Sequence, residues 1–175
     1  MKFTRFLAFP LALTALLSGC VISVGDSSVL TFLSVHDGSV AVHPRNGPDA
    51  TITAIGNLAI DGKNVTVTTE QQAMLKQYYG QALAIRAEGV ATGVAATSLA
   101  HKAVSSVATN LAHGQPDAIG PKIDAEAKKV EAQANKVCDA VAELRTTQDA
   151  LVASLPAFKP YALIDASQAA DCRSK

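Results

Sequence analysis

Hydrophobic and polar residues alternate along residues 29–67, and turn sequences interrupt the alternation at intervals. A period of two is typical of strands that bury one face. Asp37-Gly38 separates two such segments, and an Asp-Gly pair favours a two-residue hairpin because type I′ turns need positive φ at both central residues. We therefore predict a small antiparallel β-meander of about five short strands in this region. The cross-strand pairs expected in its first hairpin are Val35 with Val40 and Leu33 with Val42.

From Thr68 onward the hydrophobic spacing changes to steps of three and four residues, which indicates a helix. Thr68 and Gln71 stand at the spacing of a capping box, in which each side chain satisfies a backbone N–H of the first turn. The helical pattern continues to about Ala112 and ends at His113-Gly114-Gln115-Pro116. Gly120-Pro121 predicts the start of a second helix, since proline is favoured in the first turn.

The second helix carries a heptad repeat with smaller residues between its main positions. The main positions are Ile123, Val130, Val137, Leu144 and Leu151, and the intermediate ones are Ala127, Ala134, Val141 and Gln148. Two helices of about 50–65 Å with a short connection should lie antiparallel. The fold class predicted is α+β: the sheet, then a long antiparallel α-helical hairpin within residues 68–175, and a short C-terminal tail that folds back after Leu155-Pro156. We expect sheet and hairpin to form one domain.

Gly89 and Gly93 form a Gly-x-x-x-Gly motif in the first helix. In an apolar helix of about 20 residues this motif marks membrane-helix dimers. The uncharged stretch here, residues 89–100, is too short for that, so we expect it to remain outside the membrane. Close packing of the glycines against Ala127 and Ala134 is the prediction, and a bend of the first helix is the alternative.

The N-terminus has the layout of a secretory signal, with basic Lys2 and Arg5 followed by the apolar run 6–17. That run is too short to span about 30 Å of hydrocarbon. The sequence Leu17-Ser18-Gly19-Cys20 resembles the lipobox of bacterial lipoproteins. The resemblance implies cleavage before Cys20, a thioether-linked diacylglycerol on its sulfur, and acylation of the new amino terminus. A plain secretory signal with a chance cysteine and a transmembrane anchor are the alternatives.

On this interpretation residues 1–19 are a lipoprotein signal peptide and residues 20–28 a lipidated tether. In lipoproteins of the enteric type, Asp directly after the lipidated cysteine retains the protein in the inner membrane. Val21 occupies that position here, so the resemblance implies the outer membrane, facing the periplasm. The membrane is then a partner through the lipid anchor.

Composition narrows the classes of function. Removal of residues 1–19 takes the formal net charge from 0 to −2, and near-neutral charge without a basic block argues against nucleic-acid binding. The hydrophobic content of 49% includes only 5% aromatic residues and no Trp. Such a chain is expected to pack in thin helical layers and to lack the apolar pockets that hold small ligands, so we expect no cofactor.

Cys138 and Cys172 remain after lipidation of Cys20. An even pair of cysteines in an oxidising compartment usually forms a disulfide, and the alternative is two free thiols. Closing this loop would stabilise the fold by about 3–4 kcal/mol on the chain-entropy model. The bridge would pin the C-terminal tail to the second helix.

The histidines are the first candidates for a metal or catalytic site. In the predicted register His36 and His43 share a face of the sheet without pairing directly, and only Asp37 lies near them as a further ligand. His101 and His113 are more than three helical turns apart. The sequence contains no Gly-x-Ser-x-Gly elbow, His-Glu-x-x-His, phosphate-binding loop or spaced cysteine quartet. We therefore predict no metal site, no catalytic residue and no enzymatic activity.

Residues 56–79 resemble the YggN-like family of uncharacterised bacterial envelope proteins. The shared pattern is a short strand, an Asn/Asp-Gly turn (here Asp61-Gly62), a Val-containing strand, a Thr/Ser cap (Thr68) and a Gln-rich helix ending in Leu and Tyr. The likeness covers residues 50–85 and implies an envelope location and a strand-then-helix layout. It implies no activity, and the lipobox is a departure because members of the family are commonly secreted without an anchor.

Three hypotheses of function follow. The leading one is a non-enzymatic envelope lipoprotein that binds other envelope proteins, or itself, through the helical hairpin. The second is a lipid- or cell-wall-binding module that uses the sheet, with Phe32, Phe158 and Tyr161 as its aromatic candidates. The third is a hydrolase with an unrecognised site, which a cluster of Ser or Asp with His would support.

Overall fold

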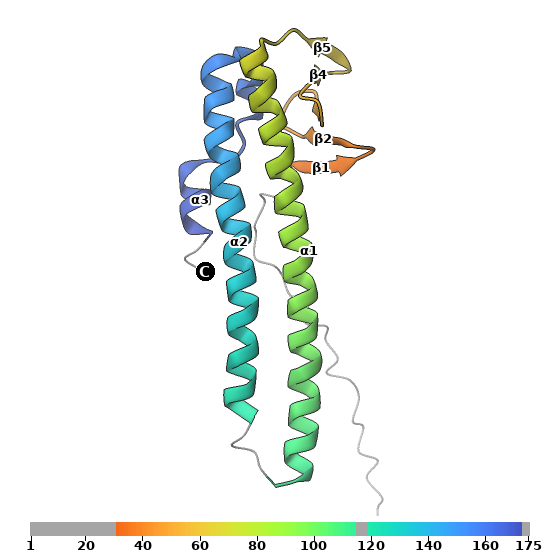
Figure 1. The fold of residues 1–175 in the computed structure, drawn as a ribbon, viewed down its shortest axis with the longest axis vertical. Helices are drawn as coiled ribbons and strands as arrows, with labels where there is room; N and C mark the ends of the chain where they lie inside the picture. The colour runs from red at the N-terminus through yellow and green to blue at the C-terminus, as the bar shows by residue number, and fades with distance from the viewer. Residues whose placement is uncertain (1–30, 115–118, 173–175) are drawn as a thin grey trace, which may run out of the picture.

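The computed structural model describes residues 31–114 and 119–172. Its fold is α+β, as predicted: a sheet lies against the upper ends of two long helices, and the helices continue beyond it (Figure 1). Cys20, the expected signal peptide and the expected tether lie outside the described residues. Within the described residues, neither long helix has the continuous apolar length that would cross a membrane.

Five strands form an antiparallel meander in sequence order. They are β1 (Leu33–His36), β2 (Ser39–Val42), β3 (Ala50–Thr53), β4 (Leu58–Ile60) and β5 (Lys63–Val65). The predicted register of the first hairpin is confirmed, with Val35 opposite Val40 and Leu33 opposite Val42. Asp37 and Gly38 have φ of 48° and 73°, the positive values that the two-residue turn requires.

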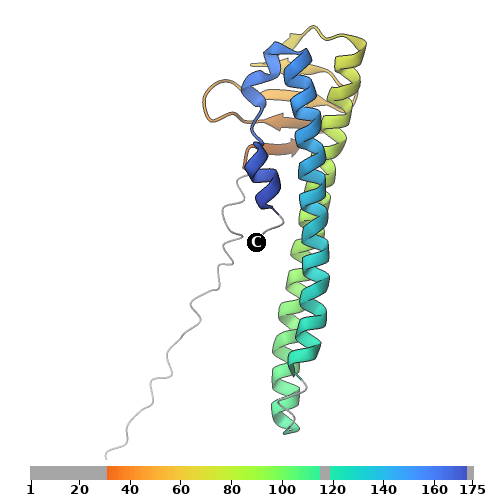
Figure 2. The same ribbon diagram turned by 90° about the vertical axis from the view of Figure 1, so that its left-hand side faces the viewer.

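The predicted helical hairpin consists of α1 (Thr69–Ala112) and α2 (Ile119–Ser154), which lie side by side in both ribbon views (Figures 1 and 2). The capping box that begins α1 is present. The Thr68 N–H donates to Gln71 Oε1 at 2.8 Å, and the Gln71 N–H donates to Thr68 Oγ1 at 3.3 Å. At the same end Gln71 Nε2 donates to the Ser154 carbonyl at 2.6 Å, which ties the start of α1 to the end of α2.

The chain after α2 folds back along that helix, as predicted (Figure 2). It forms the short 3₁₀ helix η3 (Pro156–Tyr161) and then α3 (Ala166–Asp171). The Asp165 side chain accepts from the Gln168 N–H and begins α3 with a capping box. Cys138 and Cys172 form a disulfide with a Cα–Cα distance of 5.6 Å, so the end of the described chain is joined covalently to the middle of α2.

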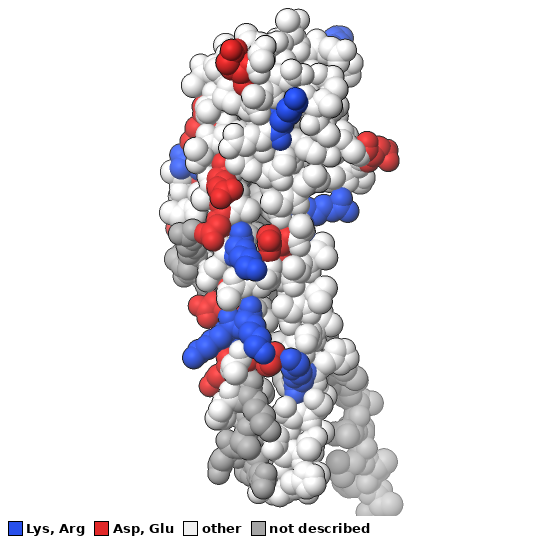
Figure 3. Space-filling model, in the orientation of Figure 1, with Lys and Arg blue, Asp and Glu red and all other residues white. Residues whose placement is uncertain are grey.

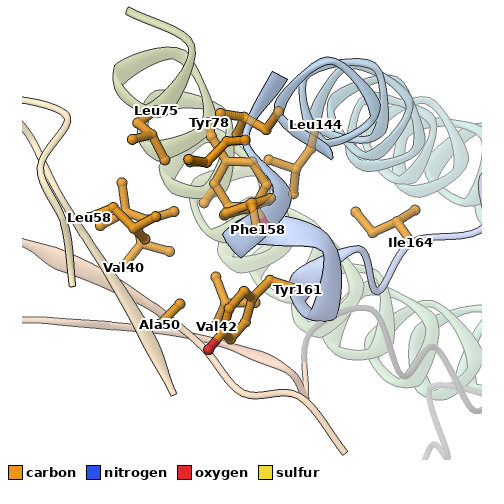
Figure 4. Packing of buried hydrophobic residues seen from close by; sticks show 14 of the residues in the cluster. Val40, Val42, Ala50, Leu58, Leu75, Tyr78, Leu144, Phe158, Tyr161 and Ile164 are labelled. Atoms are coloured by element: carbon orange, nitrogen blue, oxygen red, sulfur yellow. The ribbon is translucent and has the colours of Figure 1, made fainter. Parts of the chain in front are cut away.

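The hydrophobic core lies between the inner face of the sheet and the upper parts of the helices (Figure 4). The Phe158 ring of η3 packs edge-on against Tyr78 of α1, with 5.4 Å between ring centroids. The core also contains Val40, Val42, Ala50, Ile52, Leu58, Leu75, Ala82, Ile85, Val141, Leu144, Leu151, Leu155, Tyr161 and Ile164. The expectation of thin helical layers is therefore wrong for this end of the molecule, because the few aromatic residues are concentrated where the sheet and η3 meet the helices.

The core ends at Ile85 on α1 and at Val141 on α2. Beyond it the two helices continue as a pair, which we call the stalk and define as residues 89–112 of α1 and 119–137 of α2 (Figure 1). No other described element accompanies the helices along most of this length. The stalk is therefore the part of the described chain with the thinnest packing.

Candidate interaction surface

The heptad positions of α2 face α1 along the stalk. Ile123, Val130 and Val137 are partly buried there, and Leu144 and Leu151 are fully buried nearer the sheet. Of the two intermediate positions in the stalk, Ala134 is partly buried, whereas Ala127 is exposed and was predicted wrongly; Glu126 and Gln133 also reach α1. The reason is the number of neighbours. Along most of the stalk α2 has only α1 beside it among the described elements, and Cys172 comes near Ala134 and Asn135 at the upper end. The part of α2 above the stalk also contacts the C-terminal segment, and Val141 and Gln148 are buried there.

Polar contacts connect the two helices of the stalk. Gln133 Nε2 donates to Glu88 Oε2, and Lys102 Nζ donates to Glu126 Oε2 at 2.8 Å. Lys129 Nζ also contacts Glu126, at 2.8 Å. Hydrogen bonds from Lys102 and Lys129 hold the pKa of Glu126 below its usual value. Lys102 and Lys129 are therefore both paired with Glu126, and Glu88 is paired with Gln133.

Gly89 and Gly93 do not pack closely against α2. A Cβ built at either glycine would meet nothing within 4 Å, so the predicted packing against Ala127 and Ala134 is wrong. α1 continues through both glycines as one helix. Both positions leave open space beside the α1 backbone.

Four valine side chains of α1 are exposed in the described chain. Val90, Val94 and Val104 have 62%, 66% and 72% of their surface exposed, and Val107 has 41%. Lys102 is the one charged residue in the α1 part of the stalk, and it is paired with Glu126. Figure 3 shows charged side chains gathered over α2 and an extended uncharged surface over the neighbouring α1. We call Val90, Val94, Val104 and Val107 the exposed valines of α1.

The outer face of the sheet carries an ordered polar cluster. Ser34 Oγ lies 2.7 Å from His43 Nε2, and His43 Nδ1 lies 2.9 Å from Asp49 Oδ1. Serine, histidine and aspartate follow one another here in the order of a hydrolase triad. The expectation that only Asp37 would lie near these histidines is wrong, because the Asp49 carboxylate contacts His43. Continuing the β2–β3 register by one pair beyond Val42 and Ala50 places Asp49 opposite His43, but that register could not be read from the sequence.

The surroundings of this cluster differ from those of a triad that cleaves acyl groups. Such a triad uses a buried Asp and donors aimed at the developing oxyanion. The Asp49 side chain is 58% exposed, and Ser34 lies inside strand β1 rather than on a sharp turn. A hollow of about 240 Å³ beside His43 is lined by Phe32, His43, Arg45, Leu163 and Gln168, and Ser34 is not part of its wall. The cluster joins β1, β2 and the segment before β3.

The aromatic candidates of the sequence lie in or against the core. Phe158 and Tyr161, the aromatic candidates for a lipid or cell-wall surface, are 0% and 2% exposed and belong to the core. Phe32 is partly buried against that core. Within residues 31–114 and 119–172, no three His, Cys, Asp or Glu side chains lie close enough together to hold a metal ion.

The fold is thus a small α+β head from which a two-helix stalk extends. The chain belongs to the DUF2884 family, described as a protein of unknown function, and the family profile matches residues 28–120. The match covers the sheet and all of α1, whereas nearly all of α2 and the whole C-terminal segment lie beyond it. Neither a curated protein nor a solved structure matches the chain.

Proposed function

We propose that this chain is a non-enzymatic lipoprotein of the bacterial cell envelope that binds protein partners through its stalk. The partner is another envelope protein or a second copy of the chain. The observation that carries the proposal is the group of exposed valines on the stalk part of α1, which contains Lys102 as its one charged residue. Helices that face only water normally place charged residues on the outer side, and continuous exposed apolar surface marks interaction sites.

Three features support the envelope location. The sequence ending in Cys20 resembles a lipobox, and Val21 favours the outer membrane, facing the periplasm. The YggN-like resemblance of residues 56–79 also favours the envelope. The Cys138–Cys172 disulfide agrees with these, because disulfides persist in oxidising compartments such as the periplasm.

The anchor is tested by expressing the full chain in a bacterium that is fed an alkyne-labelled fatty acid. We expect label on the wild type and none on Cys20→Ala, which should also leave the membrane fraction. A Cys138→Ser/Cys172→Ser double variant is the control and should keep the label. Label that persists on Cys20→Ala, or a mature amino terminus at another residue, would contradict the lipoprotein proposal.

The stalk is tested by placing a photo-cross-linking amino acid at Val94 of the anchored chain in cells. We expect discrete adducts with a protein partner after illumination. The same amino acid at Ala132, an exposed residue of α2, should give markedly fewer adducts. Equal adducts at both positions, or none at either, would refute binding through the exposed valines.

A lipid- or cell-wall-binding role for the sheet is the weaker proposal. The surface it would use contains the polar Ser34, His43 and Asp49, whereas two of its three aromatic candidates are buried. Aromatic side chains that bind lipid or cell wall must be exposed, with the apolar part of the ring available at the surface.

A further inference from the structure

α1 carries two rows of residues at heptad spacing along the stalk. One row faces α2 and is partly or fully buried; it includes Thr92, Leu99, Ser106 and Asn110. The other row steps by three and four residues on the open side, and all of its members are exposed: Val90, Gly93, Thr97, Ala100, Val104 and Val107. A heptad row on a helix is a packing surface for a neighbouring helix. Two rows indicate two neighbours, and the described chain supplies one.

The exposed row continues a surface of α1 that the sheet covers higher up. A hollow of about 420 Å³ is lined by Leu33 and Val35 of β1 and by Ala82, Arg86 and Val90 of α1, which stand at four-residue steps. Arg86 Nη1 also donates to the Val35 carbonyl at 3.4 Å. β1 is the edge strand of the sheet on this side, so the sheet stops covering α1 near Val90. From there to Val107 the row is uncovered for about 26 Å.

We infer that this row binds the same row of a second copy of the chain, so that two stalks associate through α1 with α2 on the outside. The inference rests on the proposed function and names its partner. Charge favours an uncharged partner surface, which a second copy supplies. The row contains no charged residue, and the adjacent Glu88 and Lys102 are occupied by Gln133 and Glu126.

A charged partner surface would lose its hydration against this row without gaining a counter-charge. The same row on another copy brings no charge with it. Apart from Lys102, which pairs with Glu126, the exposed charges of the stalk among the described residues lie on α2, where they would stay in water: Asp124, Lys128, Lys129, Glu131 and Lys136. Dimers with twofold symmetry use the same patch on both copies, so the patch must fit itself. An uncharged row meets this condition because no like charges face each other.

The shape of the row also suits a copy. Gly93 leaves open space beside the backbone, with the exposed Val90 and Val94 next to it. Small residues at four-residue spacing let two helices approach closely, and the valines of one helix can then pack over the glycine of the other. If both copies are anchored in one membrane, the two α1 helices run parallel and each residue of the row lies near its own counterpart.

The expected contact is small. A strip about 26 Å long and about 10 Å wide is well below the area of about 800 Å² per partner that stable complexes bury. Association of free chains should therefore be weak. Anchoring in a common membrane raises the effective concentration of the copies and favours the contact.

The test uses the full, anchored chain produced in cells in two versions with different epitope tags. One version carries the photo-cross-linking amino acid at Ala100, an exposed member of the row. We expect an adduct that contains both tags. Val104→Glu in both versions should reduce it at least tenfold, because like charges then face each other, and pairing Val104→Glu with Val104→Lys should restore it. Ser105→Glu, an exposed neighbour outside the row, should leave it unchanged.

The outcomes separate this inference from the proposed function. Adducts that contain only another envelope protein overturn the second copy as partner and leave the stalk as a binding surface. A two-tag adduct that Val104→Glu leaves unchanged overturns the assigned row. Formation of the Cys138–Cys172 disulfide, followed by alkylation, verifies that each variant has folded.

Discussion

Gln148 of α2 pairs with both backbone polar groups of Ile164. Its Nε2 donates to the Ile164 carbonyl at 2.9 Å, and its Oε1 accepts from the Ile164 N–H at 3.0 Å. The side chain is 1% exposed, and the hydrogen bonds are buried. Gln148 interrupts the heptad repeat, and its side chain satisfies the backbone N–H and C=O of the returning C-terminal segment, as the backbone of a neighbouring strand would.

Replacing Gln148 by leucine should destabilise the fold although it completes the heptad pattern. The buried N–H and C=O of Ile164 would lose their partners, which should cost about 2–4 kcal/mol in the free energy of unfolding. Urea denaturation followed by circular dichroism measures the loss. Thr147→Val is the control: the Thr147 hydroxyl donates to the Glu143 carbonyl of its own helix, so the loss should be below about 1 kcal/mol. Equal stability of the Gln148→Leu variant and the wild type would contradict this role.

The two core tyrosines should respond in opposite directions to removal of their hydroxyl groups. Among the described residues the buried Tyr78 hydroxyl has no hydrogen-bond partner, and burial raises the pKa of Tyr78 above its ordinary value. Tyr161 donates to the Pro48 carbonyl at 3.0 Å. Tyr78→Phe should therefore leave stability unchanged or raise it by up to about 1 kcal/mol, whereas Tyr161→Phe should lower it by about 1 kcal/mol. Thermal and urea unfolding of both variants test this, and losses of equal size would refute it.

Loss of the Cys138–Cys172 disulfide should lower stability substantially. The bridge spans 34 positions of sequence, for which the chain-entropy model gives about 3–4 kcal/mol. The Cys138→Ser/Cys172→Ser variant and the reduced wild type should unfold at similar, lower urea concentrations. Reductant should not affect the double variant. Alkylation of both cysteines without reductant, in protein isolated from cells, would show that the bridge does not form.

Acidification should destabilise the fold through carboxylates that are hydrogen-bonded in the folded state. The Gln168 N–H lowers the pKa of Asp165, with a smaller contribution from the Ser167 hydroxyl, and Lys102 and Lys129 lower that of Glu126. Because the folded pKa values lie below the ordinary values of 3.8 and 4.5, their stabilisation is present above those values and is lost as pH falls through the folded ones.

Urea unfolding at several pH values between 7 and 2 measures this loss. An Asp165→Asn/Glu126→Gln variant should lose less stability on acidification than the wild type, since the two groups no longer titrate. If both proteins lose the same amount, these two residues do not contribute to acid sensitivity.

The Ser34–His43–Asp49 cluster should act as a clamp on the edge of the sheet. Ser34→Ala and Asp49→Ala should each lower stability by about 0.5–1.5 kcal/mol, and together by less than the sum because both act on His43. The wild type should not react with a fluorophosphonate probe for activated serines. Labelling of Ser34 that disappears in Ser34→Ala would instead support the hydrolase hypothesis.

Local patterns were sufficient to predict the elements of the head. The Asp37-Gly38 turn requires particular φ values and so sets the register of its hairpin, and the cap at Thr68 and Gln71 marks the start of α1. The oxidising compartment expected from the N-terminus led to the Cys138–Cys172 pair. Each of these predictions depends only on residues that are close in sequence or on the number of cysteines.

Contacts between distant segments could not be predicted in this way. His43 and Asp49 meet because β2 and β3 pair across a loop whose length and shape the sequence pattern does not reveal. Gln148 looked like an interruption of the heptad repeat, because its partner Ile164 comes from a segment without a periodic signal. The predicted packing of Gly89 and Gly93 failed for a similar reason, since a heptad repeat on α2 does not determine how far α1 is rotated.

The sequence by itself thus determined the α+β layout, the first hairpin, the limits of the long helices and the disulfide, because each follows from periodicity, turn chemistry or cysteine pairing. The tertiary structure decided which sides of the helices are covered. The sheet and the C-terminal segment cover the upper part of the helical hairpin. Because these segments do not extend along the stalk, Val94 and Val104 are exposed in the described chain. Burial depends on where other segments end in space, and no local pattern of residues contains that information.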